Sequence, residues 1–335
     1  MTAIPLETLI TVFGGSGFLG RHVVRALAKL GYRVRVAVRR PELAGYLQPL
    51  GRVGQIHAVQ ANVRFPASVE AAVRESDGVI NLVGILFERS RQTFETVQAR
   101  GAQSVARAAA AVGARMVHVS AIGADANGTS LYARTKALGE SLVLAAHPTA
   151  VILRPSILFG PEDDFFNKFA GIARLSPVLP LVGGGATLFQ PVFAGDVASA
   201  VVAALEDRAK PGTPYELGGP EVKSFRELMQ LVLAATERRR LLVSMPFALA
   251  RLQASVLQLM PKPLLTPDQV ELLRSDNIVS AAAKAEGRTI EALGIDPVAM
   301  EAIVPFYLRR FRKTGQYDTA SPEISGRSGT TRPRA

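Results

Sequence analysis

Three residues of this sequence have the types and spacing needed for proton transfer at a carbonyl or carbinol carbon. Tyr132 and Lys136 are four residues apart, which places both side chains on one face of a helix. A phenol with a pKa of about 10 is a poor acid–base group at neutral pH, and both a neighbouring ammonium and a bound nicotinamide cation favour its phenolate. Ser120 ends an apolar run upstream, and its hydroxyl can donate to a substrate oxygen. Ser120, Tyr132 and Lys136 are the predicted catalytic set, and Lys136 is also expected to hold the nicotinamide ribose.

A second set of residues has the spacing of a phosphate-binding turn. An apolar run at 9–13 is followed at once by Gly14, Gly17 and Gly20, and then by a helical pattern. Gly14 allows a tight turn, Gly17 lets backbone N–H groups approach a pyrophosphate, and Gly20 lets the helix pack closely on the strand. The helix N-terminus adds partial positive charge where the phosphates would lie. The turn predicted to bind a dinucleotide consists of Gly14, Gly15, Ser16, Gly17, Phe18, Leu19 and Gly20.

The end of the second apolar run indicates which dinucleotide is preferred. Arg39 and Arg40 stand there, with no acidic residue before Glu42. A carboxylate at this point would bond the adenosine ribose and repel a 2′-phosphate, whereas a guanidinium pairs with phosphate. NADP(H) is therefore favoured over NAD(H), the alternative being that both arginines only solvate a strand end. Further cofactor contacts are expected where later strands end, from Asn62, Val63, Leu82, Val83 and Gly84.

Short apolar runs alternate with helical patterns, and the elements they form must position both sets. Strands are predicted at 9–13, 33–38, 55–59, 79–83, 116–119 and 151–153. Helices are predicted near 18–30, 67–75, 93–112 and 132–146. Right-handed crossovers of these lengths make an α/β fold, a doubly wound parallel sheet of the Rossmann type. We expect a dinucleotide-binding core at 1–160, a smaller and mostly helical C-terminal part at 161–313 interleaved with it, and a disordered basic tail at 314–335.

Composition narrows the classes of function. The 335-residue chain has 48% hydrophobic residues and no cysteine, so we expect a globular protein without disulfides, thiolate catalysis or cysteine metal sites. The four histidines lack a metal-ligand spacing, so no metal site is expected. The net charge is +11, of which residues 309–335 hold +5, from seven basic and two acidic side chains. This charge suits an anionic partner, but no recognition helix or basic-aromatic pattern points to nucleic acid.

The segment 238–260 has the features of an interfacial helix. Arg238 to Arg240 precede an apolar stretch, 241–260, that Pro246 and Arg251 interrupt too much for a membrane span. On a helical projection one face is apolar, formed by Met245, Leu249, Leu252, Val256 and Leu259. The pattern predicts a contact with an anionic membrane surface or a partner, and equally a helix that walls the substrate pocket. With no leader before the first strand, we expect a cytoplasmic protein, peripheral on the cytoplasmic face of the inner membrane.

Taken together, the motifs resemble the short-chain dehydrogenase/reductase superfamily, in its extended or atypical branch, over residues 9 to about 300. The segments Gly14–Gly20, Val79–Gly84 and Tyr132–Glu140 carry this resemblance. Two further blocks, Arg154–Phe166 and Phe189–Val197, are most similar to the NADPH-binding 39 kDa-type accessory subunit family of NADH:ubiquinone oxidoreductase (complex I) and its bacterial relatives. In relatives, a segment like Pro155-Ser156 runs beside the nicotinamide. The alternative for Pro155 and Ser156 is a rigid exit from the sixth strand.

The resemblance implies two alternatives for function. In the complex I subunit the nucleotide is regarded as structural, so the first is an NAD(P)H-binding accessory protein associated with complex I or quinone metabolism. The second is a soluble NADP(H)-dependent reductase or epimerase that uses Ser120, Tyr132 and Lys136 on an unidentified small molecule. Whether the chain is an enzyme stays open here, because Tyr132 and Lys136 would also serve to hold the cofactor. The expected protein partners belong to complex I or the quinone pathway.

Overall fold

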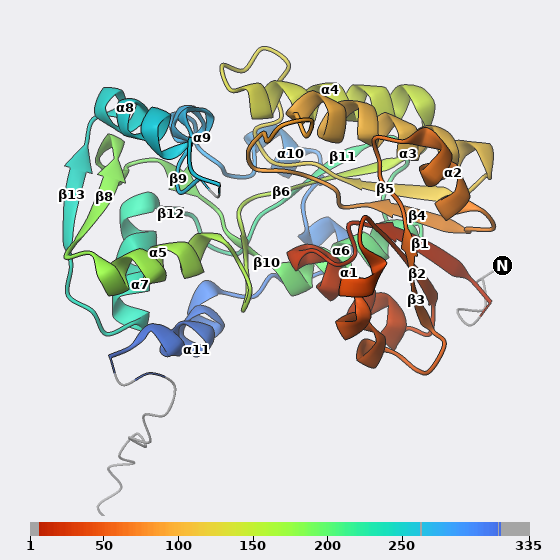
Figure 1. Ribbon diagram of the computed structural model, residues 1–335, viewed down its shortest axis with the longest axis horizontal. Helices are drawn as coiled ribbons and strands as arrows, with labels where there is room; N and C mark the ends of the chain where they lie inside the picture. The colour runs from red at the N-terminus through yellow and green to blue at the C-terminus, as the bar shows by residue number, and fades with distance from the viewer. Residues whose placement is uncertain (1–6, 262, 314, 316–335) are drawn as a thin grey trace, which may run out of the picture.

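A seven-stranded parallel sheet lies at the centre of the fold, in a computed structural model that describes residues 7–261, 263–313 and 315 (Figure 1). The strand order is β11-β6-β5-β4-β1-β2-β3. Its strands are β1 (Leu9–Phe13), β2 (Arg33–Val38), β3 (Ile56–Gln60), β4 (Gly78–Asn81), β5 (Arg115–Val119), β6 (Val151–Pro155) and β11 (Pro214–Leu217). The order reverses where β1 lies between β2 and β4, and parallel sheets bind ligands at the carboxyl ends of such strands.

Helices cover both faces of this sheet (Figure 1). One face carries α1 (Phe18–Lys29) and α6 (Ala194–Leu205), and the other carries α2 (Pro66–Val73), α3 (Arg100–Ala111) and α4 (Leu131–Ala146). Strand residues alternate between the two cores, so that Ile10 and Val12 join the first and Phe13 joins the second. The predicted doubly wound sheet is confirmed. The helix predicted near 93–112 begins as a π-helical turn, Glu95–Ala99, before α3.

The chain after residue 160 contributes β11 to the sheet and also builds a mostly helical layer beside it. The helices there are α5 (Phe165–Leu175), α7 (Phe225–Ala235), α8 (Phe247–Leu257), α9 (Pro267–Leu272), α10 (Ala281–Ala285) and α11 (Val304–Leu308). Three strand pairs join them: β7 (Leu158–Phe159) with β10 (Val192–Phe193), β9 (Leu188–Phe189) with β12 (Lys223–Ser224), and β8 (Val178–Val182) with β13 (Leu241–Met245). Phenylalanines from α5, α7 and the short strands pack ring against ring in its core. The layer thus has a core separate from the two on the sheet.

The single amphipathic helix predicted over 241–260 is wrong in its first part. Residues 241–245 form β13, which pairs in parallel with β8. Pro246 then occupies the N-cap position of α8, which covers only 247–257. The residue before a proline is pushed towards extended backbone, and a proline fits at the start of a helix but not inside one. Pro246 therefore separates a strand from a helix, and Met245 is not part of the helical face.

Two expectations from the sequence concern the C-terminal tail and the absence of a membrane-spanning helix. The predicted tail at 314–335 lies outside the described residues apart from residue 315. Among the helices that are described, none is long and apolar enough to cross a bilayer.

Candidate functional site

The glycine turn after β1 has backbone geometry that other residues would disturb. Gly14 has a φ of +78°, its N–H donates to the carbonyl of Ala37, and its own carbonyl accepts from the N–H of Gly17 at 2.9 Å. A Cβ atom on Gly20 would lie 2.3 Å from the Gly14 oxygen, well inside contact distance. Helix α1 starts after Gly17 with no side-chain cap on its N-terminus. The turn thus brings an uncapped helix end against the carboxyl end of β1.

A groove of about 250 Å³ runs from this turn along the carboxyl ends of β1, β2, β3 and β4. It brings together half of the predicted cofactor residues: Gly14, Ser16, Gly17, Arg39, Asn62, Val63, Leu82, Val83 and Gly84. Arg39 donates to the Gln92 side chain at 2.5 Å, and Arg64 also lines the groove. No carboxylate belongs to the lining in the described part of the chain. The groove offers glycine backbone and two guanidinium groups, which suits a phosphate-bearing ligand.

The other residues predicted for the turn pack against the protein core and do not line the groove. Gly15 and Leu19 are buried, and a Cβ on Gly15 would press on Val36 of β2. Phe18 packs at the edge of the α1–α6 core. Sequence reasoning missed Tyr46, whose hydroxyl donates to the carbonyl of Ser16 from a 3-10 turn at 45–50. Tyr46 therefore fixes the turn from the solvent side.

Three predicted residues lie away from the groove. Arg40 is exposed and is not among its lining residues. Pro155 ends β6, where its carbonyl accepts from the N–H of Ile122. The Ser156 hydroxyl donates to Asn277 in the C-terminal part, with a 2.6 Å contact to its side-chain oxygen. In the protein alone, Pro155 and Ser156 tie the sheet to the later chain.

Ser120, Tyr132 and Lys136 converge at the far end of the groove. Gly84 joins the two regions, since a Cβ there would lie 3.6 Å from Lys136 Nζ. Lys136 Nζ lies 5.9 Å from the Tyr132 ring centroid and 3.4 Å from the Val119 carbonyl. The Ser120 hydroxyl is buried and has no hydrogen-bond partner among the described residues. A buried polar atom without a partner points to a ligand that would satisfy it.

Burial and neighbouring carboxylates shift the pKa values of Lys136 and Tyr132. Burial lowers the pKa of Lys136 to about 8, although Glu140 opposes the shift. Burial, with the Asp268 carboxylate second, raises the pKa of Tyr132 to about 12. The protein alone therefore keeps Tyr132 as a neutral phenol at neutral pH, rather than the phenolate that the sequence favoured. A neutral phenol can donate a proton or a hydrogen bond to an oxygen in the site.

Gln98 is a polar residue of the site that sequence reasoning missed. It lies in the π-helical turn Glu95–Ala99, is 1% exposed, and has no partner for either side-chain polar atom in the described structure. Its oxygen would lie 3.8 Å from a Cβ on Gly84. π-Helical turns occur often at functional sites, and here the turn aims an amide beside Lys136. The sequence did contain a signal for Gln98, because its amide occupies a buried position on a helix face that is otherwise apolar.

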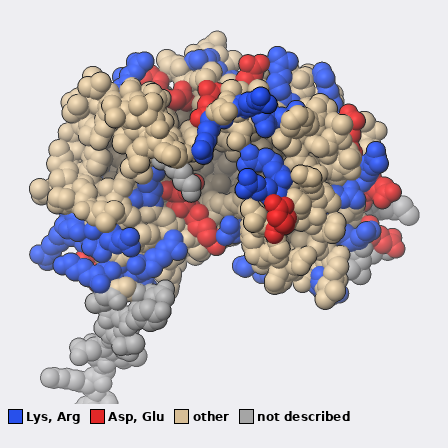
Figure 2. Space-filling view, viewed as in Figure 1, with Lys and Arg blue, Asp and Glu red and all other residues tan. Residues whose placement is uncertain are grey.

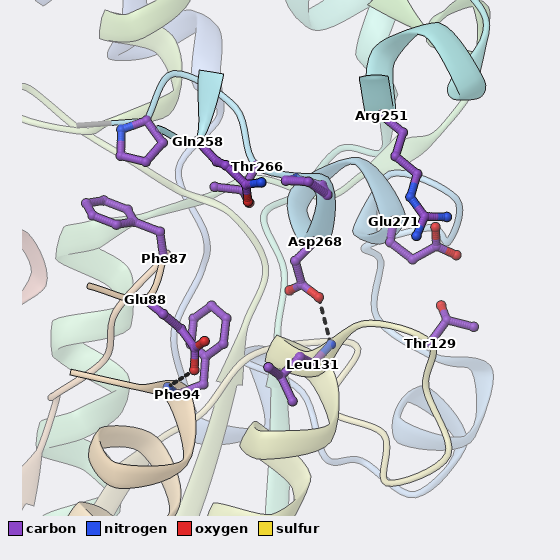
Figure 3. Close-up of a pocket in the computed structure, with 12 residues that line it drawn as sticks. Phe87, Glu88, Phe94, Thr129, Leu131, Arg251, Gln258, Thr266, Asp268 and Glu271 are labelled. Atoms are coloured by element: carbon purple, nitrogen blue, oxygen red, sulfur yellow. Dashed lines mark hydrogen bonds between the residues drawn. The ribbon is translucent and has the colours of Figure 1, made fainter. Parts of the chain in front are cut away.

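A second cavity, of about 500 Å³, is lined by Phe87, Phe94 and Leu131 on one side and by residues of α8 and α9 on the other (Figure 3). The Phe94 ring lies edge-on to the Tyr132 ring at 5.7 Å and also lines this cavity. Figure 3 shows aromatic side chains from the loop after β4 facing helix α9, with Arg251 and Glu271 beyond them. The cavity is large enough for a small substrate, and it lies between the core and helices α8 and α9.

The described residues contain no group of three or more histidine, cysteine, aspartate or glutamate side chains placed to hold a metal ion. His118 is buried against Asn81, with 3.1 Å between Nδ1 and the amide nitrogen. Burial, with Lys136 second, lowers the pKa of His118 to about 3, so this imidazole is neutral. His118 is a packed core residue of β5.

The seven-stranded parallel sheet and the glycine turn at its carboxyl edge define a Rossmann-type fold of the dinucleotide-binding class. The chain belongs to the NAD dependent epimerase/dehydratase family, whose sequence model matches residues 10–218. It is 35% identical over 318 residues to the mitochondrial NADH dehydrogenase [ubiquinone] 1 alpha subcomplex subunit 9 of Arabidopsis thaliana, covering 91% of this chain and 78% of that protein.

Two further relatives extend the comparison. A ceramide reductase of Caulobacter vibrioides is 36% identical over 180 residues, covering 54% of this chain and 56% of that protein. Among solved structures, a dTDP-glucose 4,6-dehydratase of Streptomyces venezuelae with bound NAD superposes with a TM-score of 0.68 at 20% identity, over 90% of this chain and 96% of that one. The first relative is similar in sequence, and the second establishes the shared fold.

Proposed function

We propose that this protein is an NAD(P)H-binding accessory protein that associates with respiratory complex I or with quinone metabolism, and that its nucleotide is held structurally. The observation that carries the proposal is the continuous path from the glycine turn to Gly84, where Lys136 and Gln98 meet. Its backbone turn, its guanidinium groups and its partnerless buried polar atoms fit a dinucleotide. The relative from Arabidopsis, named as a complex I subunit, supports the association.

Mass spectrometry of the nucleotide released from purified protein tests this proposal. We expect a stoichiometric dinucleotide that exchanges slowly with added nucleotide, because a tightly held ligand stabilises the folded state. Native gels of membranes should place the protein with complex I. A protein that purifies without nucleotide, and that gains no thermal stability from added NADPH or NADH, contradicts the structural role.

The preferred nucleotide in this proposal is NADP(H). Arg39 and Arg64 both line the groove at the carboxyl ends of β2 and β3, where an adenosine 2′-phosphate would lie. The absence of a carboxylate from the described lining removes the group that would bond an unphosphorylated ribose. A guanidinium fork pairs with phosphate through two parallel hydrogen bonds.

The proposed location is the cytoplasmic face of the inner membrane, through a surface that we call the α8 face. It consists of Leu249, Leu252, Val256 and Leu259 with Met260. Leu252 is 66% exposed and Leu259 is 82% exposed, whereas Ala250 and Ala254 on the opposite side of the helix are buried. The exposed strand residues Leu241 and Val243 add further apolar surface on this layer. An apolar face of this size on a surface helix suits partial insertion at a lipid interface.

Basic side chains of the C-terminal layer support this location. Figure 2 shows Lys and Arg gathered at the lower left of the molecule, on the side where α11 lies in Figure 1. Burial, with Arg240 and Arg174 close by, lowers the pKa of Arg238, so these three guanidinium groups form one cluster. Each basic residue near an anionic surface contributes about 1 kcal/mol, decaying over a Debye length. Binding should therefore be reversible and sensitive to salt.

Sedimentation with vesicles tests the location. Full-length protein should sediment with vesicles that contain phosphatidylglycerol at low salt, and it should be released at high salt. Deletion of 314–335 removes part of the basic charge and should weaken binding without unfolding the core. If the full-length protein ignores anionic vesicles at low ionic strength and is absent from native membranes, the peripheral location is wrong.

A second candidate function, a reductase or epimerase, is favoured by one observation: the Tyr132 ring, with Lys136 Nζ 5.9 Å away, packs against Phe94, which lines a cavity of about 500 Å³. A bound nicotinamide supplies or accepts a hydride. Ser120 would donate a hydrogen bond to the substrate oxygen, Tyr132 would hold or pass the proton at its hydroxyl, and Lys136 would hold the ribose and the tyrosine. The ceramide reductase similarity supports this alternative.

Two substitutions separate the candidates. Tyr132→Phe removes only a hydroxyl, so an accessory protein should keep its nucleotide and its assembly. Lys136→Ala should weaken nucleotide retention in either case, because Lys136 faces the groove end. Turnover of a defined ketone that Tyr132→Phe abolishes establishes the enzyme instead.

A further inference from the structure

The first turn of α4 is completed by a carboxylate from a distant part of the chain. Asp268 of helix α9 accepts from the backbone N–H of Leu131 at 2.7 Å and of Tyr132 at 3.2 Å (Figure 3 draws the first). It also accepts from the Ser130 hydroxyl at 2.8 Å. The first N–H groups of a helix have no partner within the helix, and Ser130 itself caps only Ala133. Asp268 thus satisfies the backbone N–H of Tyr132 and that of the residue before it.

Helix α9 is held firmly enough to place this carboxylate. Thr266 and Gln269 form a reciprocal capping box at its N-terminus. Val270 is buried against Ala250 and Ala254 of α8, on the side opposite the α8 face. A chain of packed contacts therefore runs from α8 through α9 to the N-terminus of α4.

The charge of Asp268 acts on Tyr132 as well as on the backbone. The charged groups near this phenol are Lys136 on its own helix, Asp268 on α9, and Glu88, whose carboxylate accepts from the N–H of Phe94. Burial raises the pKa of Tyr132, and the Asp268 carboxylate raises it further. An anion at this distance disfavours a second negative charge on the phenol.

We propose that Asp268 is a positioning residue for Tyr132: from the C-terminal layer it accepts from the backbone N–H groups of Leu131 and Tyr132 and so orders the first turn of α4. The proposal rests on the proposed function only for the importance of Tyr132 in the site. Helix α8 carries the α8 face on one side and contacts α9 on the other.

Two variants of Asp268 and one control test this role in full-length protein without added nucleotide. Asp268→Ala removes both the hydrogen bonds and the charge, whereas Asp268→Asn keeps an acceptor oxygen and removes the charge. Glu271→Gln is the control, because Glu271 lines the same cavity but pairs with Arg274 at 3.1 Å. The readouts are amide hydrogen exchange over 129–136 and the ¹³Cζ NMR signal of Tyr132, assigned with Tyr132→Phe.

We expect exchange at Leu131 and Tyr132 to rise at least about tenfold in Asp268→Ala, since an amide loses its partner, and to rise less in Asp268→Asn. In Asp268→Asn the ratio of phenolate to phenol for Tyr132 near pH 10 should rise about tenfold, the change for one pKa unit. Glu271→Gln should match the unchanged protein in both measurements.

The proposal is overturned if Asp268→Asn leaves the Tyr132 titration unchanged, or if Glu271→Gln alters exchange and titration as much as the Asp268 variants do. Should Asp268→Ala fail to fold, the comparison of Asp268→Asn with Glu271→Gln still decides, because both keep a polar side chain of similar size. Neither readout depends on bound nucleotide or on complex I. A failure of the proposed function therefore leaves this test unaffected.

Discussion

The half of the molecule that holds the seven-stranded sheet (the sheet half) and the C-terminal layer both contain helices with a periodic apolar face. These faces differ in how far they are buried. In helix α1 the residues Val23 and Leu27 repeat at helical spacing and are completely buried between the sheet and α6. In helix α8 the residues Leu252 and Val256 repeat at the same spacing and remain about two-thirds exposed. A periodic apolar face predicts that something will cover it, but not whether the cover is the chain itself. The apolar face of α1 is covered by the chain itself, whereas that of α8 is exposed in the described structure.

The most damaging change should be in the sheet half, at the glycine turn. In Gly20→Ala, the new Cβ would lie 2.3 Å from the Gly14 oxygen and 2.6 Å from backbone atoms of Gly15, so backbone must move. We expect a loss of about 3 kcal/mol or more in unfolding free energy, together with loss of bound nucleotide. Gly45→Ala is the matched control, because a Cβ there meets nothing within 4 Å. Equal thermal unfolding of the two variants contradicts this account of the turn.

The unfolding free energy should also fall at acid pH because of His118 in the sheet half. The folded pKa of His118, about 3, lies below its unfolded value of 6.5, so the unfolded chain binds an extra proton between those values. Stability from this group is therefore complete above pH 6.5 and falls by about 1.4 kcal/mol per pH unit as the pH drops towards 3. His118→Gln should remove that slope in denaturant titrations, whereas the exposed His57→Gln should keep it. An unchanged slope in His118→Gln refutes the assignment.

Nucleotide preference should separate two adjacent arginines. Arg39 lines the groove and Arg40 does not, although both are exposed. Arg39→Asp should cost roughly 1.5–3 kcal/mol of NADPH affinity and erode the preference over NADH. Arg40→Asp should change the ratio of the two affinities little. Calorimetric titration of the nucleotide-free protein measures both ratios, and equal affinities in the unchanged protein exclude the NADP(H) preference.

A smaller effect is expected from the α8 face, and it should leave the fold intact. Leu252→Glu with Val256→Glu replaces two exposed side chains by charges, so thermal unfolding should change by less than about 1 kcal/mol. Binding to anionic vesicles should fall about tenfold, since apolar area and favourable charge are both lost. Val53→Glu changes a fully exposed valine in the sheet half and should not alter vesicle binding. If the double variant binds anionic vesicles as well as the unchanged protein does, the α8 face has no role in membrane binding.

The sequence predicted the sheet half well because its signals are local. Buried parallel strands are continuous apolar runs, and the glycine turn requires its residues for backbone reasons that hold in any context. β11 was missed because Glu216 interrupts its short apolar run, and burial of Glu216 depends on Arg154, 3.8 Å away on β6. Gln98 and Asp268 were missed for a related reason. Their roles arise from contacts between distant segments, which periodicity does not encode.

Strand β13 has a consequence for how the protein behaves before it meets a partner. Within the described residues it pairs only with β8, so its other edge presents unpaired backbone groups beside the exposed side chains of Leu241 and Val243. Such an edge is a template for strand addition between copies and hence for aggregation. Arg238 to Arg240 come immediately before the strand, and like charges there make two copies repel each other. We therefore expect the arginines to oppose aggregation through this edge, and neutralising them should make the protein aggregate in proportion to its concentration.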